Sequence, residues 1–125
     1  MDFERQGRAA DLAITSIWPA VAIESAATQQ FTTASPAERD HLRKPTIFSD
    51  AILAILAAPP ALVNGQLLLD EDFLRAHAGV SDFAKYSLVP GTVPRRIMPQ
   101  LLPDLSVAEQ ADEGRRIDSS KRAKL

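Results

Sequence analysis

Two short runs rich in apolar residues dominate the hydrophobic pattern of the chain. Residues 12–18 contain branched and aromatic side chains and are stopped by Pro19, and residues 66–69 form a second run that directly follows Gly65. Short apolar runs bounded by such breakers are typical of strands that are buried on both faces of a parallel sheet. The pattern therefore predicts two buried strands.

The clearest helix lies between these two runs. Pro45 stands where the first turn of a helix tolerates proline, and Pro59 and Pro60 end the pattern. Between them, apolar residues recur at helical spacing: Ile47, Phe48, Ala51, Ile52, Ile55 and Leu56. This spacing predicts an amphipathic helix that packs on the strands.

The remaining segments give weaker signals. Residues 21–31 contain helix formers and predict a short helix, whereas the polar residues 32–43 predict a loop and residues 61–64 a linker. After the second strand, residues 72–78 predict one or two helical turns that Gly79 ends. The expected order is strand, helix, helix, strand and short helix.

The character of the chain changes after residue 80. Prolines recur at positions 90, 94, 99 and 103, and residues 109–124 are mostly charged. We therefore expect residues 81–125 to form a Pro-rich and charged tail that wraps over the surface. Lys85 and Tyr86 fall in this segment and are expected in a surface loop.

Two parallel strands joined through helices form one crossover unit, and such strands normally lie inside a wider sheet. Two strands alone leave open edges and uncovered apolar faces. The fold class is therefore α/β but incomplete on its own. We expect the isolated chain to be poorly folded or self-associating.

Composition excludes several classes of function. The 14 Lys and Arg nearly balance the 16 Asp and Glu, so we expect no nucleic-acid partner and no attraction to a membrane surface. Without cysteine the chain has no disulfide and no thiolate site. The longest apolar run, residues 51–58, is far shorter than the roughly 20 residues that span a bilayer.

Three segments together resemble the carboxyl-terminal part of a short-chain dehydrogenase/reductase, closest to the hydroxysteroid dehydrogenase-like branch. In order, they are ITSIWPAVAIESAA (residues 14–27), RKPTIFSDAI (43–52) and NGQLLLDEDFL (64–74). The resemblance implies that residues 1–80 are the carboxyl-terminal portion of a Rossmann-like, doubly wound parallel sheet. It also implies a parent enzyme that uses NAD or NADP.

The same resemblance points to the segment after the first strand, because ligands of such sheets bind outside the carboxyl ends of the strands. It implies that Pro19, Val21 and Ile23 contact the nicotinamide end of the cofactor. The chain departs from the family pattern here, since Ala20 stands where glycine is usual and Ser25 is the nearest hydroxyl.

Two motifs of the family are missing from the sequence. The five glycines, at 7, 65, 79, 91 and 114, never cluster into the turn that holds a pyrophosphate. The single tyrosine, Tyr86, is followed four residues later by Pro90, where the family pattern has lysine. We therefore assign no catalytic residue and expect the chain alone to bind no cofactor and to be inactive, the oxidoreductase activity being that of the parent enzyme.

Other polar residues suggest no metal centre. His41 and His77 are far apart, and the acidic residues 70–72 lack the spacing of a calcium loop, so they are interpreted as a strand end that passes into a helix. The alternative to an enzyme segment is a non-catalytic interaction protein that docks on full-length relatives, and thus forms an oligomer with them. Trp18 fits either a cofactor pocket or ordinary packing.

The chain ends in Ala123, Lys124 and Leu125, a small, a basic and a leucine residue in the order of a peroxisomal address. A flexible terminus would expose this tripeptide to a receptor. The expected location is therefore peroxisomal, with a cytoplasmic protein and an ordinary basic tail as the alternative.

Overall fold

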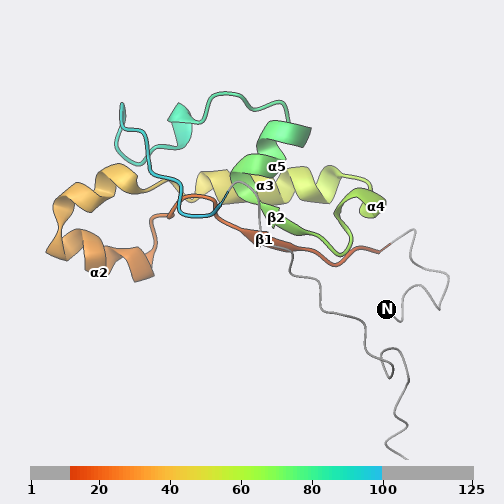
Figure 1. The fold of residues 1–125 in the computed structure, drawn as a ribbon, viewed down its shortest axis with the longest axis horizontal. Coiled ribbons are helices and arrows are strands. Elements are labelled where there is room, and N and C mark those ends of the chain that lie inside the picture. Colours follow the sequence, from red (N-terminus) through yellow and green to blue (C-terminus); the bar gives the residue numbers. More distant parts are fainter. Residues whose placement is uncertain (1–11, 100–125) are drawn as a thin grey trace, which may run out of the picture.

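The computed structural model describes residues 12–99, which form an α/β arrangement around two short strands (Figure 1). Strand β1 (Ser16–Trp18) pairs in parallel with β2 (Leu67–Leu69), and Ile17 lies opposite Leu68. The helices are α2 (Ala26–Ala34), the 3-10 helix η1 (Pro36–His41), α3 (Thr46–Ala57), α4 (Pro60–Val63), α5 (Asp70–His77) and the 3-10 helix η2 (Ala84–Tyr86). The predicted α/β class and the parallel pairing of the two strands are confirmed.

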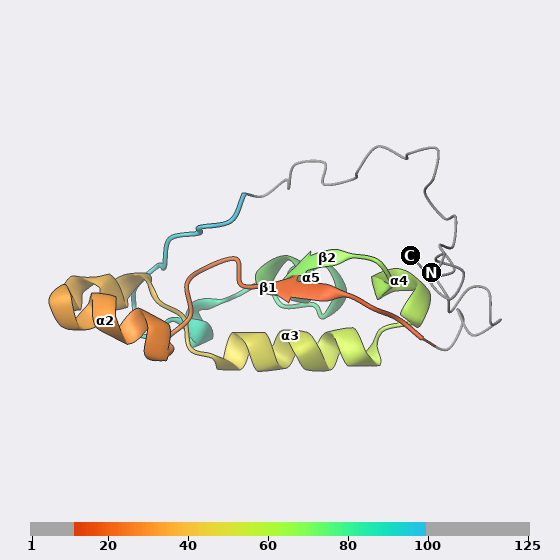
Figure 2. The same cartoon turned by 90° about the horizontal axis from the view of Figure 1, so that it is seen from below.

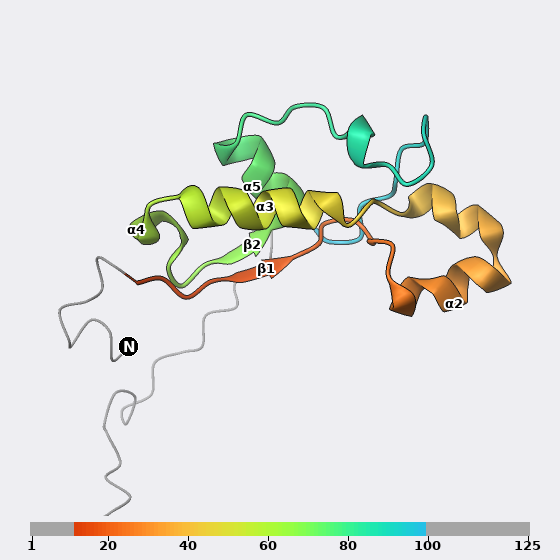
Figure 3. The ribbon, with the colours of Figure 1, turned by 180° about the vertical axis from the view of Figure 1, so that it is seen from behind.

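Helices α3 and α5 lie on the same side of the strand pair, whereas α2 and η1 protrude to one side (Figures 1 and 3). Ile17 and Leu68 of the strands pack against core residues of these helices. The core itself consists of two clusters: Ile47, Ala51, Leu74, Phe83 and Tyr86 in one, and Ile55, Val63 and Phe73 in the other. Ile17 and Leu68 are therefore packed against the helices, so one face of the strand pair is covered by α3 and α5.

The two strands are shorter and more exposed than predicted. Strand β1 covers three residues instead of 12–18, and both Ser16 and Trp18 are exposed, Trp18 by 51%. The reason is visible in Figure 2, where α3 lies along one side of the strands. No helix of residues 12–99 covers the opposite face of the strands. Side chains on that face, such as that of Trp18, are therefore exposed in this part of the chain.

Local interactions explain why α2 begins later than predicted. Ser25 precedes the helix in an extended conformation, and its Oγ accepts a hydrogen bond from the Thr28 N–H, while Thr28 Oγ1 accepts one from the Ser25 N–H. This reciprocal cap fixes the helix start at Ala26. Two regions predicted as a loop and a linker contain η1 and α4, each of which has a proline in its first turn.

The surface-loop prediction for Tyr86 is wrong. Phe83 and Tyr86 belong to the core, and Tyr86 is only 2% exposed. The Tyr86 hydroxyl donates a hydrogen bond of 2.6 Å to Asp50 Oδ2 on α3, which joins η2 to that helix. The division of the chain at residues 80 and 81 stays a prediction, although the core continues beyond it to Tyr86.

Replacing Tyr86 with phenylalanine is expected to lower the free energy of unfolding by about 1 to 2 kcal/mol, because a hydrogen bond to a charged group is lost from a half-buried site. Burial and the Asp50 carboxylate raise the pKa of Tyr86 from 10.0 to about 12. The native state therefore retains this proton longer than the unfolded chain, and the stability that it contributes is lost as the pH rises from 10 through 12. The difference in the free energy of unfolding between the wild type and Tyr86→Phe should therefore decrease as the pH rises from 10.0 to about 12.

Urea denaturation followed by circular dichroism, at pH 7 and above pH 10, measures this difference. Ser49→Ala, at an exposed position next to Asp50, is the matched control and should stay within about 0.5 kcal/mol of the wild type. Equal stability of the Tyr86→Phe variant and the wild type at pH 7 would contradict the assigned hydrogen bond.

Within residues 12–99, no helix is long and apolar enough to cross a membrane. The tripeptide at 123–125 and most of the predicted charged tail lie outside the described residues.

Candidate functional site

The segment that follows β1, residues 19–25, is fixed at its start by a buried carboxylate. Asp70, the first residue of α5, is 1% exposed, and its Oδ1 accepts hydrogen bonds from the N–H groups of Ala20 (2.8 Å) and Glu71 (2.6 Å). Asp70 thus links the end of β1 to the end of β2. The acidic residues 70–72 form the first turn of a helix, which agrees with their interpretation as a strand end passing into a helix.

The middle of the segment runs beside Arg43. The Arg43 N–H donates to the Ala22 carbonyl, and the Arg43 carbonyl accepts from the Glu24 N–H, both at 2.9 Å. The Arg43 guanidinium is buried and lies 2.8 Å from Glu71, which also pairs with Arg75. The backbone after β1 is therefore held in an extended conformation by a neighbour that is itself anchored on α5.

A third contact comes from residues 95–98, here called the strap. Arg96 pairs with Val21 in an antiparallel bridge, and the N–H groups of Ile97 (2.9 Å) and Met98 (3.2 Å) donate to the Ala20 carbonyl. Arg96 forms two hydrogen bonds of 2.7 Å with the Asp72 carboxylate on α5. This bidentate pair fastens the strap across the segment.

These contacts determine how far each of the three predicted cofactor residues is buried. Pro19 is half-buried, Val21 is 1% exposed and bridged to the strap, and Ile23 packs against the core. The three residues lie together at the end of β1. Ala22, which sequence reasoning did not select, lines the adjacent pocket. The alternation of side chains in an extended segment could have indicated it, because Val21 and Ile23 point to the opposite side.

The described residues do not fit a complete dinucleotide. A pyrophosphate needs backbone N–H groups at a glycine-rich turn and a helix N-terminus. Here the N–H of Ala20 is already donated to Asp70, and Val21 is covered by the strap. These backbone groups are therefore not free to hold a pyrophosphate, and we derive no catalytic step through a dinucleotide.

Tyr86 is likewise unsuited to acid-base chemistry. Its hydroxyl is committed to Asp50, and burial together with this carboxylate raises its pKa to about 12. The Lys85 ammonium lies 4.8 Å from the centre of the Tyr86 ring, over the face of the ring. A catalytic tyrosine needs its pKa lowered toward the working pH, which is the opposite of what is found.

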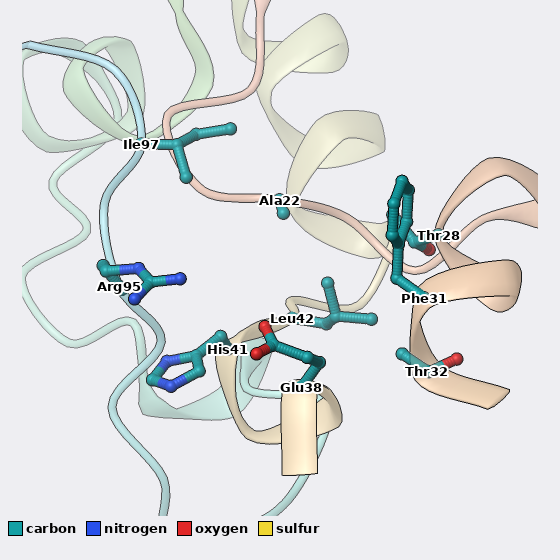
Figure 4. Close-up of a pocket in the computed structure, with 9 residues that line it drawn as sticks. All are labelled: Ala22, Thr28, Phe31, Thr32, Glu38, His41, Leu42, Arg95 and Ile97. Carbon is teal, nitrogen blue, oxygen red and sulfur yellow. The ribbon is translucent and has the colours of Figure 1, made fainter. Parts of the chain in front are cut away.

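A pocket of about 210 Å³ lies beside the segment, between α2, η1 and the strap (Figure 4). Figure 4 shows Phe31 and Ile97 on opposite sides of the pocket, with Arg95, His41 and Glu38 grouped near one another. The lining residues are Ala22, Thr28, Phe31, Thr32, Glu38, His41, Leu42, Arg95 and Ile97. We call it the Phe31 pocket.

Metal ligation finds no support in the described part of the chain. Among residues 12–99, no group of three or more His, Asp and Glu side chains is placed to hold a metal ion. Asp70 and Asp72 serve as hydrogen-bond acceptors for backbone and arginine groups.

The buried Asp70 carboxylate should make stability depend on pH. Desolvation by burial raises its pKa above the ordinary 3.8, more than the N–H groups of Ala20 and Glu71 lower it. The native state therefore binds this proton more tightly than the unfolded chain, so the contribution of Asp70 to stability falls as the pH rises above 3.8. Asp70→Asn should remove this part of the pH dependence.

Urea denaturation of both proteins between pH 3 and pH 7 measures the effect. The stability of the wild type relative to Asp70→Asn is expected to decline across this range. The matched control is Asp40→Asn, which changes an exposed carboxylate on η1. A pH-independent difference between the wild type and Asp70→Asn would contradict the raised pKa.

Comparison with solved structures points to one class of enzyme. A short-chain dehydrogenase from Mycobacterium thermoresistibile is 30% identical, with a TM-score of 0.58 over 76% of this chain and 33% of its own. A protein from Xanthomonas campestris described as a dehydrogenase is also 30% identical, with a TM-score of 0.58 over 86% of this chain and 34% of its own. No family model and no curated protein matches the sequence.

The fold is therefore that of part of a Rossmann-like short-chain dehydrogenase, as the sequence predicted. The similar proteins are dehydrogenases, which supports the resemblance to the short-chain dehydrogenase/reductase family. The chain spans about a third of the length of the structures that it matches.

Proposed function

We propose that this chain is the carboxyl-terminal segment of an NAD(P)-dependent short-chain dehydrogenase/reductase of the hydroxysteroid dehydrogenase-like branch, acting on a hydroxyl or carbonyl substrate. One observation carries the proposal: the parallel β1–β2 unit and its helices match two dehydrogenases at 30% identity over 76% and 86% of this chain, but over only a third of theirs. The segment would provide one wall of the nicotinamide site, near Pro19, Val21 and Ile23. The glycine-rich turn and the Tyr-Lys pair would lie in other parts of the enzyme.

The 5′ end of the messenger and the genomic DNA upstream of Met1 test this proposal. We expect an in-frame coding region that contains a strand, a glycine-rich turn and a helix, followed by a Tyr-x3-Lys motif. The corresponding longer protein, purified, should oxidise or reduce alcohols or ketones with a nicotinamide cofactor. A messenger with a stop codon directly upstream of Met1 would contradict the proposal.

The second candidate is a non-catalytic protein that docks on full-length relatives. The exposed Trp18 and the edge of β1 that no described strand pairs with favour it, because unpaired edges bind further strands. A tagged chain co-expressed with a full-length short-chain dehydrogenase from the same genome should then retain it on a column. Trp18→Lys should abolish retention, and retention by the variant would exclude docking at this edge.

We also propose that Ala123, Lys124 and Leu125 direct the chain to peroxisomes. A fluorescent protein that carries the last dozen residues is expected to form peroxisomal puncta in a eukaryotic cell, because the address is read by a receptor at a free terminus. Deleting Leu125 should make the signal diffuse. A diffuse signal from the intact tail, unchanged by the deletion, would contradict the assignment.

A further inference from the structure

We infer that the Asn64–Gly65 peptide is a site of spontaneous deamidation, and that the contact of Ile14 with this peptide sets the rate. The inference goes beyond the proposed function, because it concerns the chemistry of two residues of this chain and requires neither a cofactor nor the remainder of an enzyme. It rests on the sequence of the turn between α4 and β2 and on the hydrogen bonds that hold this turn.

The turn between α4 and β2 places an asparagine directly before a glycine. Asn64 is the single asparagine of the chain, is half-buried, and is followed by the exposed Gly65. Gly65 has a φ of 73°, in the left-handed region that favours glycine, so the turn itself requires this residue. Because glycine has no Cβ, no side chain of residue 65 shields its backbone nitrogen from the Asn64 side chain or from water.

These two residues carry the groups that deamidation joins, and asparagine is among the thermolabile residues. The Gly65 backbone nitrogen attacks Cγ of Asn64, so that a bond forms between these atoms and the bond from Cγ to Nδ2 breaks. Nδ2 leaves as ammonia and takes the proton of the Gly65 N–H. Water then opens the cyclic imide at one of its two carbonyls, which leaves aspartate or isoaspartate at position 64. Neither step is an oxidation or a reduction.

Ile14, which lies just before β1 and beside this turn, holds both reacting groups (Figures 1 and 3). Its N–H donates to Asn64 Oδ1 at 3.0 Å, and its carbonyl accepts from the Gly65 N–H at 2.7 Å. Ring closure requires the Asn64 side chain to turn toward the Gly65 nitrogen and this nitrogen to lose its proton. Both hydrogen bonds to Ile14 must therefore open before the reaction.

The detachment of Ile14 is a local opening that the structure resists only weakly. The Ile14 side chain is 54% exposed, and β1 begins two residues later with only three residues. Segments with few buried apolar contacts open at a small fraction of the global free energy of unfolding. We therefore expect deamidation of the folded chain to proceed slowly, from the state in which Ile14 has detached.

The product changes the start of the strand pair. Either product adds a carboxylate that is charged at pH 7, and isoaspartate also inserts a methylene into the main chain before Gly65. The Gly65 N–H and the Gln66 carbonyl are the groups that bond Ile14 and Ser16, the latter at 3.0 Å. A longer main chain moves both groups out of register, so the modified chain should lose the pairing at the beginning of β1 and β2.

Peptide mapping by mass spectrometry of the full chain, incubated in neutral buffer, measures the reaction and works equally well if the chain self-associates. Deamidation at Asn64 should be at least about tenfold slower in native buffer than in guanidinium chloride, because two hydrogen bonds must open first. Asn64→Gln is the matched control: it keeps an amide but needs a larger ring, so this position should stay unmodified in both solutions. Equal rates for the wild type in the two solutions would overturn the inference.

Variants locate the control at Ile14. Ile14→Pro removes the N–H that bonds Asn64 and should accelerate deamidation in native buffer about fivefold, with no change in denaturant. Ala13→Pro is the matched control, because Ala13 is exposed and its N–H makes no hydrogen bond within residues 12–99. Equal acceleration by the two prolines would assign the effect to strain and overturn the inference.

A milder variant covers the case in which proline disrupts the strand pair. Thr15→Val keeps the shape of the side chain and removes the hydrogen bond of 2.9 Å from Thr15 Oγ1 to the Gln66 carbonyl, so it should loosen the neighbouring Ile14 and give a smaller acceleration. Circular dichroism should show an unchanged fold for this variant. Wild-type rates in both Ile14→Pro and Thr15→Val would overturn the inference and leave the proposed function untouched.

Discussion

The purified 125-residue chain is expected to show no saturable binding of NADH or NADPH at millimolar concentration. A dinucleotide needs a pyrophosphate cradle, a partner for the ribose and a wall for the nicotinamide. Of these, only the wall has candidate residues, which we propose to be Pro19, Val21 and Ile23, and Val21 is 1% exposed beneath the strap. A wall without the cradle contributes too few contacts to offset the entropy that the cofactor loses on binding.

Turnover is expected to stay at background for the same chain. Hydride transfer needs a proton donor within hydrogen-bond reach of the substrate oxygen. Tyr86 is the single tyrosine, its hydroxyl donates to Asp50 at 2.6 Å, and its pKa is raised to about 12. The Tyr86 hydroxyl proton is therefore not available to a substrate.

Titration calorimetry with both cofactors and an assay across alcohols and ketones measure these two outcomes. A full-length short-chain dehydrogenase under the same conditions is the positive control and should bind with micromolar affinity. Micromolar binding by the 125-residue chain would overturn the segment proposal. It would require a phosphate site formed by other residues of the chain.

Local rules predicted the parts of the fold that depend on short-range patterns. The apolar spacing from Ile47 to Leu56 placed α3 within a residue or two of its observed bounds, and the Gly65 and Pro19 breakers delimited the two strands. Parallel pairing follows because the strands are joined through helices, which is a geometric requirement. These features need no knowledge of distant contacts.

Long-range contacts explain what the sequence did not predict. Tyr86 lies in a stretch without periodicity, and its burial depends on Asp50, which is 36 residues away. The burial of Val21 depends on the strap, which begins more than 70 residues later. Neither partner has a local signal, so both residues were interpreted from their immediate neighbours alone.

The sequence predicted the segment in which the candidate site lies, but not the contacts that form it. The rule that ligands bind beyond the carboxyl ends of parallel strands led to Pro19 and the residues after it. The buried Asp70 that anchors Ala20 was interpreted only as part of a strand end, because a hydrogen bond between two strand ends is a property of the assembled sheet. The Phe31 pocket likewise exists only after α2 and the strap have come together.

The isolated chain is also expected to self-associate through the open edge of β1. Gly65 N–H donates to the Ile14 carbonyl and Ser16 N–H donates to the Gln66 carbonyl, so the backbone groups of Ile14 and Ser16 face β2. In a parallel pair the intervening residues, Thr15 and Ile17, direct their backbone groups to the other edge. No strand of residues 12–99 pairs with that edge.

Exposed apolar side chains near this edge increase the tendency of the chain to self-associate. Trp18, the last residue of β1, is 51% exposed, and Ile14, two residues before the strand, is 54% exposed. Both side chains would be covered in a wider sheet. Since α3 and α5 bury one face of the strands, we expect a folded core that associates, in preference to a fully unfolded chain. Sedimentation should therefore show species larger than a monomer at micromolar concentration.

Two lysine substitutions distinguish this edge from the other exposed apolar surface. Trp18→Lys places a charge beside the open edge and should shift the sedimentation profile to the monomer. Leu56→Lys, at a residue of α3 that is 76% exposed, is the matched control and should leave association unchanged. Association lost in Leu56→Lys but kept in Trp18→Lys would assign the interface to α3. A monomeric wild type with a sharp, cooperative thermal transition would show that the two strands are stable without a neighbour at the edge of β1.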